Sequence, residues 1–290
     1  MSAVTPAQRE AYERDGVALV EGAFSGVWVE DVTAAFDRVV AKAADPDYDP
    51  RPLAGSAARS LELVRGKFGD LMVRGLTPHD PAFELWIIDS PAAQLCAEIT
   101  RSSTMRFWTD AAFQKDTTGE TNGTPWHNDY CTWPFWGEQL PILWLALTDV
   151  GIEDAPLQTL LGSHDEPHRY YSWLSPPGLG TNSMYRPWQE LLDKVAAPDA
   201  PIKAWTMRAG DCLLMHPKLI HSSLPRSSTK RGRRLALSTR WLGDDAIWAP
   251  DAYTPMCEYL SREADMVHGH APSERLFPVV WRGEPMREFV

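Results

Sequence analysis

The stretch that decides the fold is residues 141–161, PILWLALTDVGIEDAPLQTLL. Two short apolar runs, 141–150 and 157–161, are separated by glycine, aspartate and proline, a pattern typical of two strands joined by a turn. Similar short apolar or alternating runs recur at 105–113, 202–207, 212–215 and 235–242. Because no helical pattern alternates with these runs, they favour a sandwich or jelly-roll barrel over a parallel sheet.

The first hundred residues show helical patterns instead. Thr5 as N-cap, Pro6 at the first helical position and Gln8 three residues after the cap predict a short helix that ends near Gly16. A compact apolar run at 17–20 predicts a strand. Further helices are expected at 27–44, 82–88 and 91–101, and a loop is expected at 45–60. The predicted architecture is therefore mostly β with flanking helices, in which the N-terminal helices buttress a β core.

Composition restricts the class of partner. The chain has 290 residues, 28 basic and 39 acidic, for a formal net charge of −11. This balance disfavours a broad electrostatic contact with nucleic acid or with anionic lipid and favours a small-molecule partner. The four cysteines are widely spaced and include no C-x-x-C pair, which predicts reduced thiols. The sequence shows no secretory leader pattern and no long apolar run, so we expect no membrane span and a cytoplasmic location.

One short motif suggests a metal site. In TPWHNDY, residues 124–130, His127 and Asp129 are two positions apart, so on a strand they would face the same side. A second histidine, His221, lies 92 residues after Asp129 in GDCLLMHPKLIHSS, residues 210–223. Two histidines and one carboxylate leave three positions of an octahedral metal open, which is the arrangement of non-haem Fe(II) oxygenases. By itself, however, H-x-D is also compatible with an ordinary histidine beside a solvated aspartate.

A pair of arginines follows His221. Arg233 and Arg234 head the strand-like run RLALSTR, residues 234–240, where a guanidinium could bind the distal carboxylate of a keto acid in bidentate fashion. The alternative is a solvated basic turn, because several other basic residues lie nearby. For Arg234 we favour binding, with Arg233 as the alternative anchor.

Taken together, these motifs resemble the phytanoyl-CoA dioxygenase family of Fe(II)/2-oxoglutarate-dependent oxygenases. The stretches that carry the resemblance are WHNDY at 126–130, WLALTDV at 144–150, APLQTLLGSH at 155–164, the His221 motif and RLALS at 234–238. The sequence YERDGVALV at 12–20 is also similar to the family's first helix and strand. Two family motifs differ here, at DAPL (154–157) and LGSH (161–164), and one or two extra residues separate His221 from the arginine.

The resemblance implies a double-stranded β-helix, a jelly-roll of the cupin type. It implies that His127, Asp129 and His221 bind Fe(II) and that Arg234 forms a salt bridge with 2-oxoglutarate, with O₂ as the other cosubstrate. Trp144 and Ser223 match positions that contact 2-oxoglutarate in such enzymes. His216 matches a position that is not a ligand, so we expect it to be packed or hydrogen-bonded.

Aromatic residues near the metal motif are candidate walls of a substrate pocket, with core packing as the alternative. The candidates for substrate contact are Trp126, Tyr130, Trp133, Tyr170 and Trp173. His164 and His168 could also touch substrate, although structural roles are at least as plausible for them. His79, His268 and His270 are expected at the surface.

We expect a single domain over residues 1–290, with a helical part at 1–104, a β-helix core at 105–245 and a C-terminal extension at 246–290. The insert at 165–201 is rich in proline, glycine and aromatic residues, and a loop of this length is often functional. We expect it to be a mobile lid that selects substrate and shields the reaction from water, with Pro176, Pro177, Gly178 and Gly180 as hinges. The alternative is an ordered appendage that never meets substrate.

The sequence therefore predicts an Fe(II)/2-oxoglutarate-dependent oxygenase that hydroxylates a C–H bond of a small organic molecule and releases succinate and CO₂. A carboxylate at position 129 disfavours halogenation, whereas desaturation, epimerisation and cyclisation stay open. Two other classes are a non-catalytic β-barrel binding protein and a cupin-like isomerase or hydrolase that uses another divalent metal. The substrate could be a CoA thioester, but we favour a free small molecule such as a natural-product intermediate. The oligomeric state is not predicted.

Overall fold

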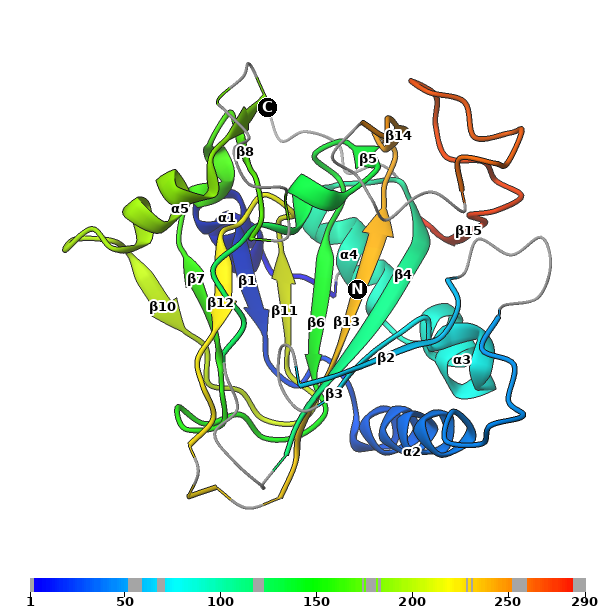
Figure 1. Cartoon of the computed structure of the whole chain (residues 1–290). Helices are drawn as coiled ribbons and strands as arrows, with labels where there is room; N and C mark the ends of the chain where they lie inside the picture. Colours follow the sequence, from blue (N-terminus) through cyan, green and yellow to red (C-terminus); the bar gives the residue numbers. More distant parts are fainter. Residues whose placement is uncertain are drawn as a thin grey trace.

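The computed structural model describes residues 3–51, 59–66, 71–116, 123–173, 175, 181, 184–227, 229–230, 232–251 and 260–283. Its centre is a large antiparallel sheet beside a smaller one (Figure 1). The large sheet has the strand order β1 (Val17–Val20), β11 (Cys212–Met215), β6 (Ile142–Ala146), β13 (Arg234–Leu242), β4 (Thr104–Lys115), β3 (Leu71–Arg74) and β2 (Glu62–Arg65), and β15 (Val279–Arg282) also pairs with β4. The small sheet has the order β10 (Ile202–Ala204), β7 (Leu157–Leu160) and β12 (His221–Ser223). This arrangement is the jelly-roll expected from the short apolar runs.

Alternation along the central strands separates two environments. On β6, Leu143 and Leu145 join the core shared with the helices, whereas Trp144 belongs to a second core on the other face. Side chains in a strand point alternately to the two faces, so a strand that is covered on both sides has a continuous apolar sequence. This explains why ILWLA is buried at all five positions.

Four helices cover one face of the large sheet. They are α1 (Pro6–Asp15), α2 (Gly26–Lys42), α3 (Pro81–Asp89) and α4 (Ala92–Thr100), and the last three lie on the outer side of that sheet in Figure 1. Phe36 of α2, Trp86 of α3 and Leu95 of α4 share one apolar cluster with the strand residues Leu143 and Leu237. The predicted cap of α1 is present, because Thr5 and Gln8 form a capping box and Gly16 ends the helix at a φ of 76°. The N-terminal part is not purely helical, since β1, β2 and β3 extend the sheet.

The insert at 165–201 contains more regular structure than the sequence predicts. It carries α5 (Trp188–Val195) and a parallel pair, β8 (Arg169–Tyr170) with β9 (Tyr185–Arg186). Leu191 of α5 packs with Tyr170, Leu160 and Ile220, so the helix is fixed to the small sheet. The four predicted hinge residues lie outside the described residues.

Two further expectations concern single residue types. His268 and His270 are exposed as expected, but the prediction for His79 was wrong: it is 8% exposed, and its Nδ1 lies 2.6 Å from the Tyr48 hydroxyl. Cys96, Cys131 and Cys212 are buried free thiols, in agreement with the expected reduced cysteines, and Cys257 lies outside the described residues. Among the helices of the described ranges, none is long and apolar enough to cross a bilayer.

Candidate metal centre

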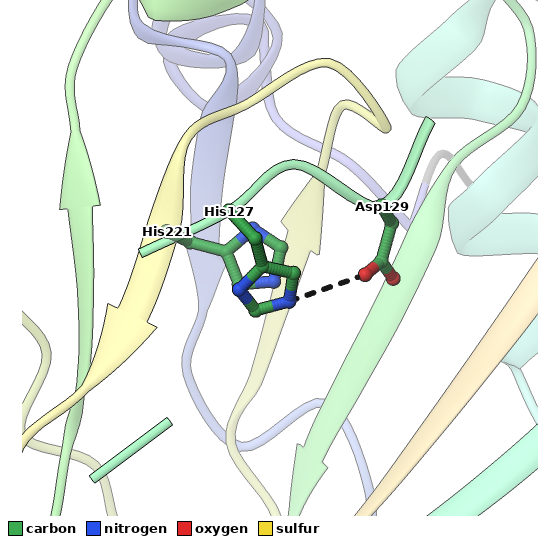
Figure 2. A group of neighbouring side chains, drawn as sticks. All are labelled: His127, Asp129 and His221. Atoms are coloured by element: carbon green, nitrogen blue, oxygen red, sulfur yellow. Dashed lines mark ion pairs between the residues drawn. The ribbon is translucent and has the colours of Figure 1, made fainter. Parts of the chain in front are cut away.

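Two histidines from distant parts of the chain are joined through their backbones. The amide of His127 donates to the carbonyl of His221 at 2.9 Å, and the amide of His221 donates to the carbonyl of His127 at 2.7 Å. This isolated antiparallel bridge places the two residues directly opposite each other at the start of β12. Their ring centroids are 4.2 Å apart, and Figure 2 shows both rings on the same side of the bridge.

Asp129 completes the group. Its Oδ1 lies 3.4 Å from Nε2 of His127, and the ligand atoms of His127, Asp129 and His221 all lie within 4.8 Å of one another (Figure 2). The sequence predicted this convergence from i, i+2 spacing on one strand, and that reason was wrong. Asp129 instead begins a 3₁₀ turn, Asp129–Thr132, whose N-cap is Asn128. The turn bends the chain directly after the bridge and directs the carboxylate back toward the rings.

Hydrogen bonds fix the orientation of both imidazoles. Nδ1 of His127 lies 2.8 Å from the carbonyl of Pro125, and Nδ1 of His221 lies 2.9 Å from the carbonyl of Leu219. A carbonyl only accepts, so each Nδ1 carries a proton, and in the neutral ring this leaves Nε2 with the lone pair that a metal ligand requires. Burial, followed by the nearby His127, lowers the pKa of His221 to about 4, which keeps its ring neutral at pH 7.

The second oxygen of Asp129 is held by an arginine. Nη2 of Arg240 donates to Oδ2 of Asp129 at 3.0 Å. Burial would raise the pKa of this carboxyl, but the pKa of Asp129 is lowered, and the charge of Arg240 is the main opposing cause. The three side chains therefore offer two imidazole nitrogens and one carboxylate oxygen, a donor set that fits Fe(II).

The group opens on a cavity of about 640 Å³. The cavity lies between the two sheets, since residues of β4, β6 and β13 line it together with residues of β7 and β12. Its aromatic lining comes from Phe113, Trp133, Trp144 and Trp173. A volume of this size is typical of a small-molecule site.

One end of the cavity is strongly basic. Arg234, only 2% exposed, donates from Nη2 to the carbonyl of Ala155 at 2.6 Å, and its Nε has no hydrogen-bond partner among the described residues. Directly across the strand pair lies Lys115, whose Nζ donates to the hydroxyl of Ser223 at 3.3 Å. Burial, followed by the charge of Arg226, lowers the pKa of Arg234 to about 10. Two facing buried cations favour an anionic ligand between them.

The two neighbouring arginines have different environments. Arg234 lines the cavity, whereas Arg233 turns outward and donates from Nη2 to Oδ2 of Asp37 in α2 at 2.8 Å. Side chains alternate along β13, so Arg234, Ser238 and Arg240 share the cavity face and Arg233 lies just before the strand. The same alternation is visible in RLALSTR and could have identified Arg240. Lys115 carries no such signal, because its place opposite Arg234 depends on the pairing of β4 with β13.

The aromatic candidates for substrate contact fall into two groups. Trp133 and Trp173 line the cavity, as does Trp144. Trp126, Tyr130 and Tyr170 are not among the lining residues. Trp126 and Tyr170 pack with α5 and the small sheet, and Tyr130 lies in the core, where its ring is 3.8 Å from the guanidinium of Arg169.

The insert reaches the cavity through one short segment. Ser172, Trp173 and Ser175 line it, and the ring of Trp173 meets that of His127 edge to face at 4.8 Å. The other histidines lie elsewhere. His164 contacts the carbonyl of Glu13, His216 pairs with Glu138, and His168 contacts Arg186.

Several solved structures share this fold. The non-haem α-ketoglutarate-dependent carbocyclase SnoK of nogalamycin biosynthesis superposes with a TM-score of 0.71 at 20% identity, over 97% of this chain and 99% of that one. The epimerase SnoN of the same biosynthesis gives 0.68 at 20% identity, over 97% of both chains. EctD from S. alaskensis, solved with 2-oxoglutarate and 5-hydroxyectoine, gives 0.64 at 18% identity, over 83% of this chain and 77% of that one. No curated protein sequence matches.

The family comparison covers most of the chain. Residues 12–235 match the phytanoyl-CoA dioxygenase (PhyH) family, a range that contains both histidines, the aspartate and Arg234. The match confirms the family indicated by the sequence motifs, and with it the enzyme class and its use of iron and 2-oxoglutarate. The chain belongs to the PhyH family of Fe(II)/2-oxoglutarate-dependent oxygenases.

Proposed function

We propose that His127, Asp129 and His221 bind Fe(II), that Arg234 binds the distal carboxylate of 2-oxoglutarate, and that the protein hydroxylates a C–H bond of a free small molecule. The observation that carries this proposal is the convergence of three ligand atoms within 4.8 Å at the wall of a cavity that also contains the buried Arg234. When bound, iron with 2-oxoglutarate and O₂ supplies the oxidising power, and succinate and CO₂ are released.

Each side chain has a defined task in this proposal. The hydrogen bonds to Pro125 and Leu219 hold the two imidazoles with Nε2 toward the metal position. Arg240 holds one oxygen of Asp129, so that the other oxygen faces the histidines.

At the basic end, Arg234, Lys115 and Ser223 orient the distal carboxylate of 2-oxoglutarate, and Trp144 forms the wall beside them. Trp133 and Trp173 restrict access of water to the reacting bond.

Other reactions of this enzyme class also begin by breaking a C–H bond of the substrate and use the same kind of site. The carboxylate of Asp129 occupies the position that a halide would need, so halogenation is disfavoured. Epimerisation and cyclisation are supported as alternatives by the fold shared with SnoN, an epimerase, and SnoK, a carbocyclase. Desaturation is a further alternative. We retain hydroxylation as the default outcome.

The cellular setting is inferred from the chain itself. Three buried free thiols support a cytoplasmic location. The net charge of −11 supports a small-molecule substrate rather than nucleic acid. The fold shared with two enzymes of nogalamycin biosynthesis supports a natural-product intermediate.

The test is succinate release from 2-oxoglutarate with Fe(II) and ascorbate, measured against a panel of candidate substrates. Stoichiometric iron together with substrate-stimulated succinate release is the expected result. A chain that binds small molecules but no iron would support the rival hypothesis, a non-catalytic β-barrel binding protein.

A further inference from the structure

A second basic region lines the cavity, apart from Arg234. Arg74 is the last residue of β3, and it pairs with Ala111 on β4. Ala111 pairs in turn with Ser238 on β13, and Ser238 pairs with Trp144 on β6. These four residues form one row across the large sheet, and all four line the cavity. Neighbouring strands lie about 4.8 Å apart, so the backbone of Arg74 is about 10 Å from that of Ser238. Arg74 therefore occupies the β2–β3 rim of the cavity.

The charges at this rim are incompletely balanced. Arg59 and Arg74 share one carboxylate, that of Glu62, at 3.7 Å and 3.5 Å. The first distance is too long for a hydrogen bond and the second is at the limit. The carboxylate is also 46% exposed, whereas the two arginine side chains are 19% and 26% exposed. Nη1 of Arg59 is buried with no hydrogen-bond partner among the described residues.

The other charges of the cavity have assigned partners. Arg240 is paired with Asp129, and both oxygens of Asp110 accept from the backbone amides of Leu76 and Thr77. The described lining contains five basic and three acidic side chains, although the chain as a whole has a net charge of −11. Bound 2-oxoglutarate would account for this excess of two positive charges, because it would contact Arg234 and Lys115. At the rim, Arg59 and Arg74 share the single, half-exposed carboxylate of Glu62 at long distances, and the buried Nη1 of Arg59 has no hydrogen-bond partner among the described residues. Buried guanidinium groups with incomplete partners favour an anionic ligand.

We propose that Arg59 and Arg74 bind an anionic group of the substrate, so that the substrate is an organic anion such as a carboxylate or a phosphate ester. This inference rests on the proposed function, because it places the reacting C–H bond at the metal and the anionic group at the β2–β3 rim. Glu62 occupies the place of this group when substrate is absent, and its exposed carboxylate is displaced when substrate binds. Bidentate arginine pairs recognise both carboxylates and phosphates.

The test compares an anion with its neutral isostere. The holoprotein, loaded anaerobically with Fe(II) and saturating 2-oxoglutarate, is titrated by calorimetry with 4-phenylbutyrate, 4-phenylbutyramide and phenyl phosphate. Saturating 2-oxoglutarate keeps the probes away from Arg234. Hydrogen bonds between charged groups stabilise a complex more than hydrogen bonds to a neutral group. The anions should therefore bind at least about tenfold more tightly than the amide. Equal affinities for the anions and the amide, or no binding of either anion, would overturn the proposal.

Variants identify the residues responsible. Arg74→Gln and the double variant Arg59→Gln/Arg74→Gln should abolish the preference for anions, whereas Glu62→Gln should strengthen it because a competing carboxylate is removed. Arg101→Gln, which breaks an exposed ion pair with Glu13, is the control and should keep the parent preference. If the arginines only joined β2 to β3, Glu62→Gln and Arg74→Gln would lower the melting temperature equally and neither would change probe affinity.

Binding of Fe(II) and of 2-oxoglutarate is measured for every variant. If the parent fails to bind them, the proposed function fails. If both bind and the anion preference is absent, or if the preference persists in the double variant, only the present inference fails.

Discussion

The two walls of the cavity are built differently. The wall that carries Arg234, Ser238 and Arg240 is β13, which pairs with β4 along its whole length and with β6 over residues 236–240. The rim that carries Arg59 and Arg74 is formed at β2 and β3, and β2 is the last strand of the sheet. A strand with two neighbours has its register fixed from both sides, whereas an edge strand is fixed from one side only. The structure thus places the proposed 2-oxoglutarate anchor Arg234, and Arg240 beside Asp129, on a central strand of the large sheet, and the proposed substrate recognition at the edge of that sheet.

The largest expected effect comes from the metal ligands. His221→Ala removes an imidazole that the backbone bridge with His127 and the hydrogen bond to Leu219 hold in place. Fe(II) binding and succinate release should therefore both fall to background. His216→Ala is the matched control, because His216 pairs with Glu138 outside the metal group and should leave the iron stoichiometry unchanged. Anaerobic metal titration measures both variants. Wild-type Fe(II) affinity in the double variant His127→Ala/Asp129→Ala would place the site elsewhere.

The next effect concerns the cosubstrate. Lysine cannot make the bidentate contact of arginine, and loss of a buried charged pair costs about 2–5 kcal/mol. Arg234→Lys should therefore raise the apparent KM for 2-oxoglutarate by at least about 30-fold. Arg233→Lys changes an arginine that points toward Asp37 and should leave this KM unchanged. The reverse result would show that Arg233 is the anchor.

A smaller effect is expected from the residue that holds Asp129. Arg240→Gln removes the charged donor to Oδ2 of Asp129, and loss of such an outer partner reduces metal affinity about 10- to 100-fold. The control is Arg275→Gln, because Arg275 pairs with Glu263 and Asp265 at the surface. Unchanged Fe(II) affinity in Arg240→Gln would mean that the 3₁₀ turn alone positions the carboxylate.

The smallest effect is expected from the insert. Trp173→Ala removes the ring that contacts His127, so water should reach the site and succinate release without added substrate should rise. Trp126→Ala is the control, since Trp126 packs against α5 outside the cavity lining. Measuring succinate release and melting temperature together separates the alternatives. A Trp173→Ala protein that melts earlier but keeps the parent's substrate-free rate would support the appendage hypothesis for the insert.

Regular strands and local turns could be predicted because their signals are local. The capping box of Thr5 and Gln8, the termination at Gly16 and the doubly covered run ILWLA depend on side-chain spacing within a few residues. Strands β2, β3 and β15 were not predicted. Each has four residues; β3 and β15 pair with β4, and β2 pairs with β3 at the end of the sheet. Their own sequences carry little alternation.

By itself, the sequence determined the kinds of atoms available: two imidazoles, a carboxylate and a guanidinium in motifs that match one family. Only the tertiary structure decided how they meet, because the bridge joins His127 to His221, 94 residues later, and the turn at Asp129 directs the carboxylate toward them. The same holds for Lys115 opposite Arg234 and for Arg74 in the row with Ser238, which depend on the register between strands. Register is a property of pairs of strands, and the alternation within a single strand cannot specify its partner.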